Sequence, residues 1–153
     1  MRTKRKNVFR RISVSIVSLF LIMTLTSCGD YGDQFGVDYG HSNIYTDAEI
    51  KAAVDETLQI FSGFTGCEMH NIRYLGDNYS MDEYFNMMNE MYPDNNYTQI
   101  IVFTSDFHTP EVKNEYDWWD PDKEYRDYRW VLARISSKDR WEVINYGTDC
   151  LNP

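Results

Sequence analysis

The residues best suited to acid–base chemistry are Asp106 and His108, which stand two positions apart near the end of an apolar run. Alternate residues of a strand point to the same face, so a strand that reaches His108 would bring both side chains together. A carboxylate in that place can orient an imidazole for proton transfer. However, the chain offers no nucleophile motif beside them, and a surface histidine near an acid is common. We therefore assign no catalytic residue and keep Asp106 and His108 as candidate binding residues.

Trp118 and Trp119 lie in a polar segment, residues 117–124, where large rings are unusual. They either fold back onto the sheet or serve as exposed anchors for a partner protein or a sugar ring, since aromatic faces dominate such contacts. Asp120, Asp122 and Glu124 recur at every second position, as calcium ligands sometimes do, but no glycine follows to form the tight turn. We expect no metal site, and no cofactor, because the chain also lacks Walker, Rossmann and zincin patterns.

Cys67 and Cys150 are two of the three cysteines of the chain. Outside the cell a disulfide between them is permitted, and we expect it to hold the C-terminal tail near the start of the first long strand. Neither cysteine belongs to a Cys-x-x-Cys pair, and His70, three residues after Cys67, does not complete a metal site alone.

The N-terminus combines a basic stretch with a short apolar run that ends at Cys28. Six lysines and arginines precede the apolar residues 12–26, which are too few to span a bilayer and lead directly to small residues. The ending Leu25-Thr26-Ser27-Cys28 resembles the lipobox of bacterial lipoproteins. The resemblance implies a signal peptide over residues 1–27, cleavage before Cys28 and a lipid on its thiol. We expect the protein on the extracytoplasmic face of the cell membrane, anchored by that lipid.

Beyond the signal segment the chain is strongly acidic. The segment holds six of the 15 basic side chains and none of the 24 acidic ones, so the remainder has a net charge of −15. Such a chain repels phosphate backbones, which excludes nucleic acid as a partner. It also repels anionic lipid, so membrane attachment rests on the lipid at Cys28. Four glycines of residues 29–45 predict a flexible tether over residues 28–45, and residues 46–153 are enough for a single domain.

Two helices are expected in this domain. Thr46 and Glu49 form a capping box, and the following apolar residues recur at helical spacing until Phe61. A second capping box, from Ser80 to Glu83, predicts a shorter helix that Pro93 ends.

Strands are predicted over residues 68–75 and 97–107, and a hairpin over residues 125–136 and 140–146. The strand predicted over residues 97–107 has apolar residues on both faces, which indicates that other elements cover both faces. In the hairpin, pairing Ser136 with Arg140 would place Arg134 opposite Glu142 and Trp130 opposite Tyr146.

These elements predict an α+β fold in which a long N-terminal helix and a shorter helix pack on a curved antiparallel sheet of about four strands. The arrangement resembles the cystatin-like and nuclear-transport-factor-like folds. Residues 46–147 also resemble small uncharacterised lipoproteins of Gram-positive gut bacteria, in Gly66-Cys67, in residues 102–107 and in the closing hairpin. That resemblance implies no activity and no catalytic residue.

Two functions fit these features. The first is a surface-tethered, non-enzymatic module that binds a protein or glycan at the cell surface, with exposed Trp118 and Trp119 as its anchors. The second is a small-molecule pocket or enzyme of the nuclear-transport-factor-like type, between the first helix and the sheet. Its candidate polar residues are Asp106, His108, Arg134, Glu142 and Tyr146. Fold alone does not decide between them.

Overall fold

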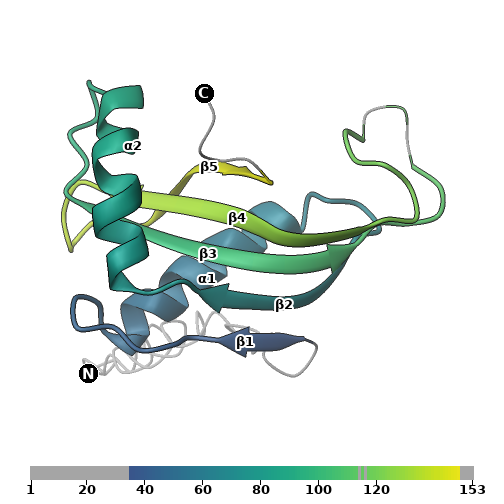
Figure 1. The fold of residues 1–153 in the computed structure, drawn as a ribbon, viewed down its shortest axis with the longest axis horizontal. Helices are drawn as coiled ribbons and strands as arrows, with labels where there is room; N and C mark the ends of the chain where they lie inside the picture. The colour runs from purple at the N-terminus through teal and green to yellow at the C-terminus, as the bar shows by residue number, and fades with distance from the viewer. Residues whose placement is uncertain (1–34, 114, 116, 149–153) are drawn as a thin grey trace, which may run out of the picture. The chain divides into compact units, whose positions relative to one another are not determined.

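The computed structural model describes residues 35–113, 115 and 117–148, which build a five-stranded sheet with helical segments on both faces (Figure 1). The strand order is β1-β2-β3-β4-β5, with β1 parallel to β2 and all other neighbours antiparallel. The strands are β1 (Gly36–Asp38), β2 (Glu68–Tyr74), β3 (Gln99–His108), β4 (Glu124–Arg134) and β5 (Glu142–Gly147). The predicted α+β class is confirmed.

Helix α1 (Asp47–Phe61) covers one face of the sheet. The capping box is present: the Thr46 hydroxyl accepts from the Glu49 backbone N–H, and the Glu49 carboxylate accepts from the Thr46 N–H at 2.9 Å. Its buried residues include Ile50, Val54 and Leu58, as the helical spacing predicted. They pack against the rings and aliphatic side chains of β2, β3 and β4.

The opposite face of the sheet carries a π-helical turn, η2 (Tyr79–Tyr84), followed by α2 (Phe85–Met91). The expected capping box at Ser80 is wrong. The Ser80 hydroxyl instead donates to the Gly76 carbonyl at 3.1 Å and accepts from the Val102 N–H at 3.2 Å. The Ser80 hydroxyl therefore supplies an acceptor to the Val102 N–H of β3, at a position beyond the end of β2. This tertiary hydrogen bond takes the place of the helix cap that the local sequence predicts.

Strand β3 is covered on both faces, which confirms the prediction from its apolar pattern. Ile101 and Phe103 belong to the core under α1, whereas Ile100 and Val102 belong to the core under η2 and α2. Figure 1 shows β3 in the middle of the sheet, with α1 behind it and α2 at one end.

The sheet has five strands rather than about four because part of the expected tether pairs with it. Residues 36–38 form β1 beside β2, and Tyr45 is buried in the core with its hydroxyl donating to the Ile100 carbonyl at 2.8 Å. The loop before α1 is held by Asp77, which accepts from the Ser42 hydroxyl and the Asn43 N–H. The described part of the tether, residues 35–45, thus belongs to the domain, and its aromatic rings give it apolar area to bury.

The closing hairpin contains the predicted pair Trp130–Tyr146, but Arg134 does not face Glu142. A bulge between Val131 and Leu132 shifts the register by one residue, so that Glu142 lies opposite Ala133. Within residues 35–113, 115 and 117–148, no helix has the length and apolar character needed to cross a membrane.

Candidate functional site

Two exposed aromatic rings lie on the α1 side of the sheet, beyond the end of α1. The Trp118 side chain is 51% exposed and Tyr146 is 45% exposed. Trp118 stacks on Tyr128 with ring centroids 5.8 Å apart, and Tyr146 stacks on Trp130 at 5.4 Å. Phe64 lies between them, 5.6 Å from Trp118 and 6.0 Å from Tyr146. We call these five residues the aromatic surface.

The aromatic surface is built by segments far apart in the sequence. Tyr128 and Trp130 are two residues apart on β4 and point to the same face, and Tyr146 is opposite Trp130 on β5. Phe64 comes from the turn after α1, and Trp118 comes from the connection between β3 and β4. Sequence reasoning selected Trp118 and Tyr146 for different sites and missed Phe64 and Tyr128. The alternation of rings in β4 was the available signal for Tyr128.

Thr109, which is fully buried, joins the two ends of the connection between β3 and β4 that carries Trp118. The Thr109 N–H donates to the Lys123 carbonyl at 3.0 Å, and its hydroxyl accepts from the Lys123 N–H at 2.9 Å and donates to the Asp120 carbonyl at 2.7 Å. Lys113 also donates to the Trp119 carbonyl at 3.0 Å. These bonds fix the backbone that follows Trp118 and so restrict the position of the Trp118 ring.

The two adjacent tryptophans separate into an exposed and a buried residue. Trp119 is 2% exposed and packs on Phe64, with ring centroids 5.6 Å apart, as part of the core under α1. Of the pair, Trp119 thus folds back onto the core, whereas Trp118 is exposed, and the anchor role of Trp118 stays a prediction. Trp119 also carries a buried indole N–H without a hydrogen-bond acceptor.

Asp106 and His108 do not form a dyad. The Asp106 carboxylate accepts from the Asn71 side-chain amide at 2.8 Å and from the Asp127 N–H at 2.9 Å. The His108 Nε2 lies 3.4 Å from the Asp122 carboxylate. Each side chain therefore stabilises a different piece of the sheet end, and a strand irregularity between Ser105 and Phe107 separates them.

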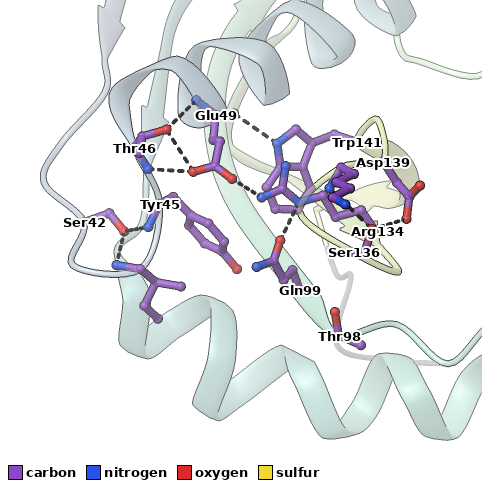
Figure 2. Close-up of polar contacts among 12 residues, drawn as sticks. Ser42, Tyr45, Thr46, Glu49, Thr98, Gln99, Arg134, Ser136, Asp139 and Trp141 are labelled. Atoms are coloured by element: carbon purple, nitrogen blue, oxygen red, sulfur yellow. Dashed lines mark hydrogen bonds and ion pairs between the residues drawn. The ribbon is translucent and has the colours of Figure 1, made fainter.

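Arg134 is nine-tenths buried and is bound to groups of α1 and β3 (Figure 2). Its guanidinium donates to the Glu49 carboxylate of α1 and to the Gln99 side-chain carbonyl of β3, the latter at 2.5 Å. It lies over the Trp141 ring, 4.2 Å from the centroid, and the Trp141 indole N–H donates to the Glu49 carbonyl at 3.0 Å. This cluster joins α1 to β3 and β4, and Arg134 also belongs to the lining of the open groove beside it.

The space between α1 and the sheet is filled by side chains, and the recesses that remain are open to solvent. A groove of about 360 Å³ runs beside the Arg134 cluster, along Glu56, Arg140 and Trp141. A larger cleft of about 900 Å³ lies at the C-terminal end of α1. Apolar residues form much of its lining, namely Phe35, Leu58, Phe61, Phe64, Cys67 and Met69.

Cys67 is half-buried in this cleft. Burial and, to a smaller extent, the negative charge of Asp117 together raise the pKa of its thiol to about 11. The thiolate is therefore scarce at neutral pH, so the thiol is a poor nucleophile. Cys150, the expected disulfide partner, and Cys28, the expected lipidation site, lie outside the described residues, so both assignments stay predictions.

The three acidic residues with calcium-like spacing point to different partners. Asp120 pairs with Lys123 at 3.0 Å, Asp122 with His108 at 3.4 Å, and Glu124 with His70 at 3.1 Å. In the part of the chain that the structure describes, no three histidine, cysteine or acidic side chains are grouped so that they could hold a metal ion.

Comparison with known proteins identified no relative of this chain. No protein-family model matches it, and no match was found among curated proteins or solved structures.

Proposed function

We propose that this protein is a lipid-anchored, extracytoplasmic binding module without enzymatic activity, and that its aromatic surface contacts a protein or glycan at the cell surface. The observation that carries the proposal is the pair of exposed rings, Trp118 and Tyr146, resting on a rigid aromatic base. Large exposed rings on a fixed support are typical of binding anchors, because little entropy is lost when they are covered.

The anchoring part of the proposal rests on the sequence from residue 1 to Cys28. Labelling cells with an alkyne analogue of palmitate tests it. We expect the label on the wild-type protein and on the Cys67→Ser variant, and no label on the Cys28→Ser variant. Equal labelling of both variants would overturn the anchoring assignment.

The arrangement of α1 across a mostly antiparallel sheet supports a further proposal, that the domain belongs to the cystatin-like or nuclear-transport-factor-like folds. The parallel edge strand β1 is an addition to the expected architecture, and the expected shorter helix, formed by η2 and α2, lies on the face of the sheet opposite α1. We also propose that the protein is of the same type as the small Gram-positive lipoproteins that it resembles. The alternative function, a pocket protein or enzyme of the nuclear-transport-factor-like type, needs space under α1 where buried side chains now lie.

Binding at the aromatic surface is tested with the full-length protein, kept soluble by a non-ionic amphipol. It is measured against arrays of neutral and charged cell-surface glycans, and on intact cells with a photo-cross-linking residue at position 120, an exposed position two residues after Trp118. We expect the double variant Trp118→Ala, Tyr146→Ala to lose at least about tenfold in affinity for whichever partner binds. Ile135→Ala is the control. Ile135 is also a large apolar residue and is 55% exposed, but it lies in the hairpin turn, outside the aromatic surface. Loss of binding in the control, or retention in the double variant, contradicts the proposal.

A further inference from the structure

We propose that the cleft at the C-terminal end of α1 is a second binding site, for an organic cation that carries an apolar body. The cleft adjoins the aromatic surface and shares Phe64 with it, but Trp118 and Tyr146, which carry the proposed protein or glycan contact, are not among the described residues that line the cleft. The proposal stands on the size of the cleft, on the aromatic residues in its wall and on the sign of the charges around it.

The cleft has the dimensions of a small-molecule site. Its volume of about 900 Å³ lies within the range of about 300–1,000 Å³ typical of such sites. Its lining comes mainly from one stretch, the last turn of α1 together with the turn and strand that follow, and Phe35 closes it from the edge of the sheet. Because these segments belong to regular elements or to the tight turn between them, the wall is preformed.

The wall offers apolar and aromatic area to a ligand. Phe61 and Phe64 have ring centroids 5.2 Å apart and are largely buried, so they form a fixed apolar floor, and the half-buried Phe35 is the aromatic residue that a ligand can reach. Met69 adds a polarizable side chain that adapts to ligand shape. Aromatic faces attract ammonium groups through the ring quadrupole, and this attraction is strongest where water is partly excluded.

The charges around the cleft select the sign of the ligand. Glu68 lines the cleft, and His70, which also lines it, pairs with the Glu124 carboxylate at 3.1 Å. No lysine or arginine belongs to the described lining of the cleft. The raised pKa of Cys67 has the same origin in part, since the charge of Asp117 disfavours a thiolate there. The field in the cleft is therefore negative, which repels an anion and attracts a cation.

Hydrogen-bonding groups at the rim complete the site. Ser62 and Thr65 belong to the lining, and the Ser62 hydroxyl donates to the Gln59 carbonyl at 2.7 Å. An alkylated ammonium with an apolar body uses the Phe35 ring, the apolar floor and the negative field, and it needs few directed hydrogen bonds. This class of ligand fits the lining better than a sugar or a carboxylic acid.

Three naphthalene probes of matched size test the proposal: a naphthylmethyl-trimethylammonium, a naphthalenemethanol and a naphthalenesulfonate. Binding to the full-length protein in non-ionic amphipol is measured by calorimetry, with the polymer alone as the blank. We expect the ammonium to bind at least about tenfold more tightly than the sulfonate, with the alcohol between them. Equal binding of all three probes, tightest binding of the sulfonate, or no binding of the ammonium up to millimolar concentration would overturn the assignment.

Variants locate the site. Glu68→Gln is expected to weaken the ammonium by about threefold and to leave the alcohol unchanged, because only the charge is removed. Glu142→Gln is the matched control, since Glu142 is an exposed acid at the start of β5 outside this cleft. Met69→Lys should weaken the ammonium and strengthen the sulfonate. An identical response to Glu68→Gln and Glu142→Gln would contradict a site in the cleft.

The same measurements keep this site distinct from the aromatic surface. Trp118→Ala is expected to leave probe binding unchanged, because Trp118 contacts Phe64 but does not line the cleft. Loss of probe binding in Trp118→Ala would show that the probe occupies the aromatic surface instead. Failure of the partner-binding experiment would not alter the probe result, and failure of the probe experiment would leave the aromatic surface as proposed.

Discussion

Arg134 of β4 pairs with Glu49 in the first turn of α1, and the Arg134 side chain is 4% exposed. Glu49 has two further tasks: its carboxylate completes the capping box with Thr46, and its backbone carbonyl accepts from Trp141. The hydrogen bonds from Thr46 and from Arg134 lower the pKa of Glu49 below its ordinary value. A single carboxylate therefore fixes the start of the helix and its position on the sheet.

Glu49→Gln should lower the free energy of unfolding by about 2 kcal/mol. Glutamine can still accept in the capping box, but the buried guanidinium loses its counter-charge. The expected loss lies below that of a fully buried pair because the Glu49 side chain is 26% exposed. Urea unfolding measures the change. Glu56→Gln removes the partner of Arg140, whose side chain is 80% exposed, and should leave stability close to that of the wild type. Equal effects of the two substitutions would contradict this interpretation.

Asp77 should make stability depend on acid pH. Burial raises its pKa, but hydrogen bonds from Ser42, Asn43 and Tyr74 outweigh that effect and hold the pKa below the ordinary 3.8. A lowered carboxyl pKa contributes stability above the unfolded-state value, and the contribution is lost as the pH falls through the folded-state value.

Urea unfolding at pH 5, 4 and 3 tests this dependence. We expect Asp77→Asn to be less stable than the wild type at pH 5 and to lose less stability between pH 5 and pH 3. Asp94→Asn, in the exposed turn after α2, serves as the control and should keep the wild-type profile. A wild-type slope in Asp77→Asn would show that the loop before α1 is held by other groups.

The four tryptophans should differ sharply in solvent access. Trp118 is 51% exposed, whereas Trp119, Trp130 and Trp141 are each at most 3% exposed. Acrylamide quenching of fluorescence should therefore lose most of its accessible component in Trp118→Phe and keep it in Trp119→Phe. The opposite result would show that Trp119 rather than Trp118 is exposed, and it would remove the main support for the proposed binding function.

The Cys67 thiol should react slowly at neutral pH. Burial and the charge of Asp117 raise its pKa to about 11, so the thiolate fraction grows by about tenfold per pH unit up to that value. In a variant with Cys28→Ser and Cys150→Ser, the rate of alkylation by iodoacetamide should follow this rise. Adding Cys67→Ser gives the background rate. A rate that levels off near pH 9 would mean that the cleft does not disfavour the thiolate.

Local sequence signals predicted the elements well where the deciding contacts are close in the chain. The capping box of Thr46 and Glu49 and the apolar spacing up to Phe61 involve residues within a few positions of one another, so α1 was placed correctly. The two-sided apolar pattern of residues 100–103 likewise predicted a strand covered on both faces. The same reasoning failed at Ser80, where a strand N–H from β3 binds the hydroxyl that was expected to cap a helix.

The errors in predicted strand register and partner residues arise where the deciding contact lies outside the local sequence. A bulge between Val131 and Leu132 moves Glu142 to the position opposite Ala133, and no residue type in the hairpin signals it. Arg134 pairs instead with the carboxylate of Glu49 on α1, which is 85 positions away in the sequence. In the same way, β1 forms because the edge of β2 is open to pairing, whereas residues 29–45, which contain β1, are rich in glycine and typical of a tether.

The sequence by itself determined the net charge, the two helices, the four longer strands and the aromatic residues available for binding. Only the tertiary structure decided which rings are exposed, because Trp118 and Trp119 are adjacent and chemically alike, and burial depends on what packs against each. It also decided that Tyr146 joins Trp118 over Phe64, and that the open cleft lies at the end of α1 rather than beneath it. Both outcomes depend on contacts between distant segments, which form only when α1, the sheet and the connection between β3 and β4 are packed together.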